Sequence, residues 1–176
     1  MPQAVYQIDP AHTAAHFTVR HMMITNVRGE FAKVSGKFVW DPEKPADLEV
    51  EAVIDATSIR TRDAQRDAHL KSADFFDIEK FPEITFRSRG ARVIEGGLEV
   101  SGDLTIHGHT REVALEVEGP TPEAKDPWGF TRIGATITTR IHRKDFGLTW
   151  NAALETGGVL VGDEVKIAID VEGIRQ

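Results

Sequence analysis

The 176-residue chain contains no cysteine. Disulfide bonds and thiolate metal sites are therefore excluded, and the redox compartment stays open. The chain also has no run approaching the roughly twenty apolar residues of a membrane-spanning helix, so we expect no stable membrane insertion. The residues from Met1 to Tyr6 lack the basic start and apolar core of a secretory signal, which predicts a cytoplasmic protein.

Positive charge is also in short supply. The 21 Lys and Arg residues face 28 Asp and Glu residues, for a net charge of -7 at pH 7. Proteins that bind nucleic acid need basic side chains to neutralise phosphates, so we predict no nucleic-acid partner. The sequence has no nucleophile elbow, phosphate loop or Rossmann glycine pattern, so we expect no enzyme and no cofactor. The length predicts a single domain over residues 1–176.

Seven histidines raise the question of a metal site. His12, His16 and His21 are the densest group, but His16 and His21 point to opposite faces if this segment is a strand. Three ligands cannot converge locally in that case, so we expect no metal.

Most of the chain alternates apolar and polar residues with the period of two that is typical of half-buried strands. The alternation predicts about eight strands at hairpin spacing, including one long strand from Arg28 to Trp40. Strands that are apolar on one side favour antiparallel pairing in a sandwich or a closed barrel. Small residues on the inward faces, such as Ala52 and Ala135, favour a barrel with space for a ligand over a solid sandwich.

The alternation stops between Thr57 and Pro82. Arg62 to Lys71 consists of good helix formers without a β-branched residue, which predicts a short helix. Phe75 and Phe76 follow it, and Phe81 precedes Pro82, which returns the chain to extended structure. We therefore expect one helix and an aromatic cluster to cover one end of the barrel.

Six segments, in the same order and spacing, resemble the YceI family of polyisoprenoid-binding, lipocalin-like proteins. They are IDPAHTAAHFTVRHM (8–22), VRGEF (27–31), RDAHLKSADFFDIEKFPEITFRS (66–88), GDLTIHGHTREV (102–113), RKDFGL (143–148) and GDEVKIAIDVE (162–172). The resemblance implies an all-β fold, an extended eight-stranded antiparallel barrel whose pore takes a long isoprenoid with its polar head near the mouth. Many relatives are exported to the periplasm, unlike the expectation for this chain, and a homodimer fits the family.

We hypothesise a non-catalytic protein that binds a prenyl phosphate, prenol or quinone-like lipid for transport, storage or sequestration. Inward alternation or a place at the barrel ends selects the expected apolar lining: Phe17, Val19, Met22, Met23, Phe38, Ile54, Phe75, Phe76, Phe86, Leu104, Ile137, Phe146, Trp150 and Ile167. His21 and Arg62 are candidates for the polar head group. Two alternatives stay open: an isomerase or hydrolase acting on an apolar isoprenoid in the same pore, and a structural dimer whose lipid is adventitious.

Overall fold

The computed structural model describes residues 3–155 and 158–176. Met1 and Pro2, on which the cytoplasmic prediction partly rests, lie outside these residues. In the described ranges no helix is long and apolar enough to span a bilayer.

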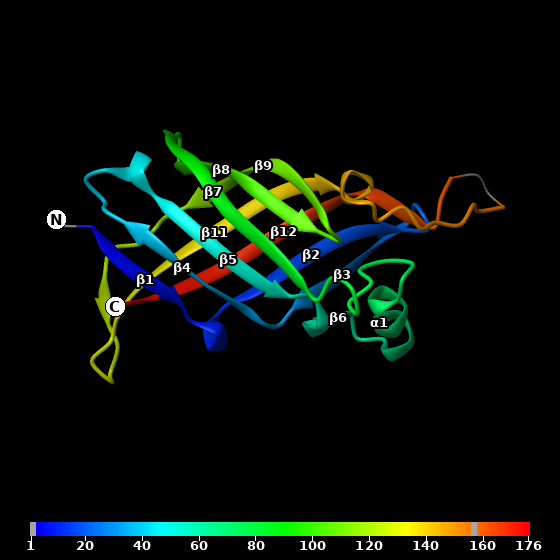
Figure 1. Cartoon of the computed structure of the whole chain (residues 1–176), viewed down its shortest axis with the longest axis horizontal. Coiled ribbons are helices and arrows are strands. Elements are labelled where there is room, and N and C mark those ends of the chain that lie inside the picture. Colours follow the sequence, from blue (N-terminus) through cyan, green and yellow to red (C-terminus); the bar gives the residue numbers. More distant parts are fainter. Residues whose placement is uncertain (1–2, 156–157) are drawn as a thin grey trace.

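Eight antiparallel strands close into an elongated barrel (Figure 1). In ring order they are β11-β9-β8-β7-β5-β4-β1-β12, and pairing between β11 and β12 closes the ring. The strands are β1 (Ala4–Ile8), β4 (Val34–Trp40), β5 (Glu49–Asp55), β7 (Glu83–Ile94), β8 (Gly97–Ile106), β9 (His109–Glu118), β11 (Thr131–His142) and β12 (Val161–Arg175). The expected all-β barrel of eight strands is confirmed.

The fifteen-residue strand β12 joins three other strands. Along one edge it pairs with β11 from Glu164 to Ile174. Along the other edge it pairs with β1 near its C-terminal end and with β2 (Ala14–His21) over the remainder. Strand β2 pairs with β3 (Thr25–Phe31), which pairs with the short β6 (Ile59–Arg60). These three strands extend the barrel wall at one end.

The prediction of one strand from Arg28 to Trp40 is wrong, because β3 ends at Phe31 and β4 begins at Val34. Phe31 and Val34 are both buried, with 7% and 2% of their surface exposed. Residues three apart point to opposite faces of a continuous strand, so both can face the interior only if the chain reorients between them. The break at Ala32 and Lys33 provides this reorientation.

The one α-helix among the described residues is α1 (Ala64–Lys71). It begins two residues later than predicted, because Arg62 has a left-handed φ of 67°. Asp63 caps the helix: its side chain accepts the backbone N–H of Arg66 at 3.0 Å. The remaining elements are β10 (Ala124–Lys125) and the 3-10 helices η1 (Pro10–His12), η2 (Pro45–Asp47), η3 (Ala56–Ser58) and η4 (Arg143–Phe146).

The two ends of the barrel differ. Helix α1 and the segment after η4 lie at one end, and both chain termini lie at the other (Figure 1). The core consists of the inward faces of the barrel strands, and partly buried residues such as Leu70 and Phe76 pack against it from the helical end. This arrangement leaves the barrel axis as the place for a cavity.

Candidate functional site

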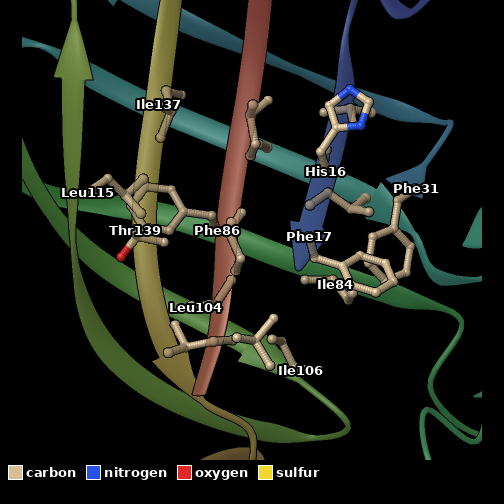
Figure 2. A pocket seen from close by; sticks show the side chains of 18 of the residues that line it. His16, Phe17, Phe31, Ile84, Phe86, Leu104, Ile106, Leu115, Ile137 and Thr139 are labelled. Atoms are coloured by element: carbon tan, nitrogen blue, oxygen red, sulfur yellow. The ribbon is translucent and has the colours of Figure 1, made fainter. Parts of the chain in front are cut away.

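An apolar cavity of about 220 Å³ lies inside the barrel. A cavity of about 150 Å³ lined by aliphatic and aromatic residues already accepts a benzene-sized ligand. Every barrel strand except β1 contributes two or more lining residues, and β1 contributes Ile8. Figure 2 shows apolar side chains from facing strands, among them Phe86, Leu104 and Ile137, gathered around this space.

The cavity is long and narrow, as its contacts with a single strand show. On β12 it touches every second residue from Val165 to Val171, the face that alternation predicts to point inward. At about 3.3 Å per residue, those six steps cover about 20 Å along the strand. The shape is therefore that of a tunnel and matches an extended chain better than a compact ligand.

Hydrocarbon side chains make up nearly all of the lining. Only His16, Thr139 and Arg143 among the lining residues carry a polar side chain. The apolar lining residues are Ile8, Ala15, Phe17, Val19, Phe31, Val34, Phe38, Leu48, Val50, Ala52, Ile54, Leu70, Phe75, Phe76, Ile84, Phe86, Leu104, Ile106, Leu115, Val117, Pro120, Ala135, Ile137, Ile141, Leu148, Val161, Val165, Ile167, Ile169 and Val171.

Two of the polar exceptions offer little to a ligand. The His16 side chain is 55% exposed, and its Nδ1 lies 3.8 Å from Glu30 Oε2. The Thr139 hydroxyl donates to the backbone carbonyl of Ala114 at 2.9 Å. Within the described lining, no two titratable groups therefore converge in a way that would suit acid–base chemistry.

Arg143 is the third exception, and it is buried, with 4% of its surface exposed. Its guanidinium donates to the carbonyls of Leu148 at 2.7 Å, Gly162 at 2.8 Å, Trp150 at 2.9 Å and Val161 at 3.2 Å. Burial lowers its pKa, although the charge of Asp163 opposes that shift. The guanidinium connects the segment after η4 to the start of β12. It therefore places a cation at the helical end of the tunnel.

A lid closes the helical end. Leu70 of α1 and both Phe75 and Phe76, which follow it, line the cavity. Phe76 packs edge-on against Phe31 with ring centroids 5.5 Å apart. Trp150 packs against Phe75 at 5.3 Å and against His69 at 4.7 Å. Two segments far apart in sequence therefore meet in one aromatic cluster over the end of the tunnel.

The structure gathers ten of the sixteen residues selected from the sequence around the cavity. These are Phe17, Val19, Phe38, Ile54, Phe75, Phe76, Phe86, Leu104, Ile137 and Ile167. The other six do not touch it: His21, Met22, Met23, Arg62, Phe146 and Trp150.

Each residue outside the lining has a physical reason. Met22 and Met23 form the β2–β3 turn, where positive φ angles of 52° and 64° direct them outward. Phe146 is 1% exposed in η4 and packs in the core beyond the tunnel. Trp150 does not touch the tunnel, but it packs against Phe75, which does.

The two head-group candidates also lie outside. His21 is the last residue of β2, two positions beyond Val19, the last residue of β2 that lines the cavity. Arg62 is exposed in the connection between β6 and α1. The structure places neither of them at the tunnel.

Sequence reasoning missed several lining residues. Leu48, Val50 and Val165 lie on faces that the alternation predicted to be inward, so that signal could have found them. Phe31 was missed because the single strand expected from Arg28 to Trp40 would point its side chain outward, whereas the break after Phe31 lets it point inward. Arg143 carried no signal, since an isolated arginine after a strand is ordinarily exposed.

One polar cluster lies apart from the tunnel. Donor atoms of Asp9, His12 and Glu172 are close enough together to hold a metal ion. Arg132 already donates to Asp9 Oδ2 at 2.7 Å and to Glu172 Oε2 at 3.1 Å, and to Asp126 Oδ2 at 2.6 Å. A guanidinium therefore supplies the positive charge that these carboxylates require.

Comparison with known proteins identifies relatives of the whole chain. A family model described as the YceI-like domain matches residues 6–173. A UPF0312 protein of Vibrio cholerae is 36% identical, the match covering 98% of this chain and 88% of that protein. A UPF0312 protein of Staphylococcus aureus is also 36% identical, with 95% of each chain covered.

Solved structures share the fold. BcnA of Burkholderia cenocepacia has a TM-score of 0.78 at 25% identity, covering 94% of this chain and 98% of its own. The YCEI protein of Campylobacter jejuni has a TM-score of 0.72 at 28% identity, covering 89% and 90%. A polyisoprenoid-binding domain from Saccharophagus degradans has a TM-score of 0.70 at 16% identity, covering 98% and 99%.

Proposed function

This chain belongs to the YceI-like family, and from that premise we propose that it binds a long-chain polyisoprenoid in the barrel tunnel for transport, storage or sequestration. The observation that carries the proposal is the continuous hydrocarbon lining of a narrow tunnel. An isoprenoid tail has no hydrogen-bonding groups, so it gives up no hydrogen bonds with water when it enters an apolar tunnel. Each buried methylene contributes about 0.8 kcal/mol. The ligand class of the Saccharophagus degradans domain agrees with this proposal.

The polar head group belongs, in this proposal, at the end of the tunnel where Arg143 lies. Its guanidinium is hydrogen-bonded to backbone carbonyls and has no carboxylate in contact within the described residues. A prenyl phosphate placed there would supply the missing negative charge. A prenyl phosphate should therefore bind more tightly than a prenol of the same length. Equal affinities would place the head group elsewhere.

Lipid identification is the direct test. The protein is purified without detergent and extracted with organic solvent, and the extract is examined by mass spectrometry. We expect one long-chain isoprenoid per protein, and the emptied protein should take up added prenol. Recovery of no stoichiometric lipid, together with no uptake of prenols, would overturn the proposal.

A variant that blocks the tunnel provides a specific control. Ala52 of β5 lines the cavity, so Ala52→Trp fills part of it. Losing contact with even two methylenes lowers affinity about tenfold. Ala168→Trp adds the same bulk at an exposed position on β12, where it should not affect uptake. Equal loss in both variants would indicate general damage to the barrel.

A further inference from the structure

The β2–β3 hairpin ends in three consecutive exposed apolar residues. Met22, Met23 and Ile24 are 42%, 52% and 72% exposed. Val159, 38% exposed, belongs to the neighbouring segment, which is tied to the hairpin by a 2.7 Å hydrogen bond from the Met22 N–H to the Leu160 carbonyl. We call Met22, Met23, Ile24 and Val159 the apolar tip. It lies at the helical end of the barrel, away from the termini (Figure 1).

The backbone of this turn is unfavourable for its residues. Met22 and Met23 both have left-handed φ angles, and the Ile24 N–H donates to the His21 carbonyl at 3.2 Å. A β-turn with positive φ at both central positions strongly favours Asn-Gly, because a left-handed conformation brings the Cβ of other residues too close to a backbone carbonyl oxygen. Because Met22 and Met23 are exposed, packing in the core does not offset the conformational cost of these backbone angles. Strain of this kind concentrates at functional sites.

The hairpin is also exceptional in charge. The chain has 28 acidic residues, yet none lies between Pro10 and Gly29. The pairing register aligns Arg28 of β3, Thr18 of β2, Lys166 of β12 and Arg140 of β11 in one row across the outer face. We call Arg28, Lys166 and Arg140 the basic row. The protein has a net charge of -7, yet this row presents three cations on the outer face of the barrel.

Carboxylates close to the basic row are already paired. Asp163 lies 3.0 Å from His142 Nδ1, and Glu164 lies 3.4 Å from Arg140. Arg28 is exposed and pairs with no carboxylate in the described structure. Arg28 and Lys166 therefore remain available to an anionic surface.

The apolar tip lies close in sequence to residues that line the tunnel. Val19 of β2 and Val161 of β12 line the cavity, and the tip residues lie three to five positions beyond Val19 and two before Val161. A lipid that entered or left at the helical end would pass beside the tip. The partner that best fits this surface is therefore a lipid bilayer.

We propose that the apolar tip docks onto an anionic lipid bilayer, with the methionine and isoleucine side chains in the interfacial layer and the basic row facing the lipid phosphates. Thr18 lies in line with the basic row on β2 and is four residues, or about 13 Å, from Met22. Peripheral apolar surfaces enter a bilayer by about 5–10 Å, which brings the row to the head groups. This inference rests on the proposed function, since docking would place the tunnel beside its lipid source.

Vesicle sedimentation tests the docking. Wild-type protein should bind vesicles of phosphatidylcholine with phosphatidylglycerol more tightly than vesicles of phosphatidylcholine alone. The variant Met22→Asn/Met23→Gly removes the apolar side chains and gives the turn its favoured residues. It should bind at least about tenfold more weakly while its thermal unfolding temperature stays equal or rises.

Two further variants separate the contribution of the apolar tip to vesicle binding from that of the basic row. Trp128 is 77% exposed in the connection between β10 and β11, beside the part of β11 that pairs with the C-terminal end of β12. Trp128→Ala therefore removes a larger apolar side chain away from the tip and should not affect vesicle binding. Arg28→Ala should weaken binding to anionic vesicles about fivefold and leave binding to neutral vesicles unchanged. Equal effects of Trp128→Ala and the Met22→Asn/Met23→Gly variant would contradict the assignment of the tip.

Other outcomes overturn the proposal. Wild-type protein that fails to sediment with anionic vesicles excludes docking, as does a Met22→Asn/Met23→Gly variant that sediments like the wild type. Concentration-dependent dimers that this variant abolishes, without any vesicle binding by the wild type, would assign the tip to self-association. The tunnel-blocked Ala52→Trp protein should still bind vesicles, so a failed lipid uptake and a failed docking are distinguishable.

Discussion

At the scale of single residues, Asp9 joins distant parts of the chain through one carboxylate. It lies after β1 and contacts His12 at 2.8 Å and Arg132 of β11 at 2.7 Å. The hydrogen bond to His12, and then that to Arg132, lower the pKa of Asp9 to about 2. The contacts of Asp9 therefore hold the connection between β1 and β2 against β11, away from the tunnel.

The lowered pKa of Asp9 predicts acid sensitivity. Because the folded-state pKa lies below the ordinary value near 4, the stabilisation is complete above about pH 4 and is lost as the pH falls towards 2. Asp9→Asn should lower the free energy of unfolding by up to about 2 kcal/mol at pH 7 and by nearly nothing at pH 2. Urea unfolding of both proteins at the two pH values measures this. A constant difference would show that the charge is unimportant.

Tyr6 predicts the opposite pH behaviour. Its hydroxyl donates to Glu123 Oε1 at 2.6 Å, and burial together with this bond raises its pKa to about 12. The raised pKa stabilises the fold fully below about pH 10, and this stabilisation is lost as the pH rises through 12. Tyr6 is the only tyrosine in the sequence, so ultraviolet absorbance follows its ionisation without overlap. We expect a midpoint near 12 in native protein and near 10 in urea. A native midpoint near 10 would contradict the assigned contact.

At the scale of elements, α1 and the segment around Trp150 act together as the lid. The edge-on contact of His69 with Trp150 and the tilted contact of Phe75 with Trp150 connect them. Each aromatic pair contributes about 0.5–1.5 kcal/mol beyond simple burial. The lid is therefore held by a few contacts that a single substitution can remove.

Loss of the Trp150 ring should loosen the lid. Removing two aromatic contacts of about 1 kcal/mol or less each predicts that Trp150→Ala releases bound prenol about tenfold faster. Stopped-flow exchange against a fluorescent prenol measures the rate. Trp128→Ala, at an exposed position, should leave it unchanged. An unaltered rate in Trp150→Ala would mean that the ligand leaves by another route.

The success of sequence reasoning at this scale followed the regularity of each element. Strict alternation placed Ile54, Phe86 and Ile167 inside the tunnel, because a strand fixes where each side chain points. Alternation says nothing about turns, so the outward direction of Met22 and Met23 was not predictable. Their orientation depends on left-handed backbone angles that the residue types disfavour. Arg143 was missed for a related reason, since its carbonyl partners come from distant segments.

At the scale of the whole molecule, a ligand that bound in the tunnel would stabilise the fold. A ligand present at a hundred times its dissociation constant stabilises the native state by about 2.7 kcal/mol. For a chain of this size that corresponds to about 5–10 °C in the unfolding temperature. Lipid-extracted and refolded protein should therefore melt about 5–10 °C below the loaded form in calorimetry. Re-addition of prenol should restore the difference, and equal melting temperatures would show that the tunnel carries no ligand.

The three-way pairing of β12 has a consequence for synthesis. Strand β1 pairs with β4 along one edge and β2 pairs with β3 along one edge, but the other edge of each pairs with β12, far along the chain. Until β12 has been synthesised, one edge of β1 and one edge of β2 have no partner, and the barrel cannot close. Such late closure slows folding and exposes nascent edges to aggregation. Closure of the barrel is therefore a late step of folding, because it depends on the strand that joins β11, β1 and β2.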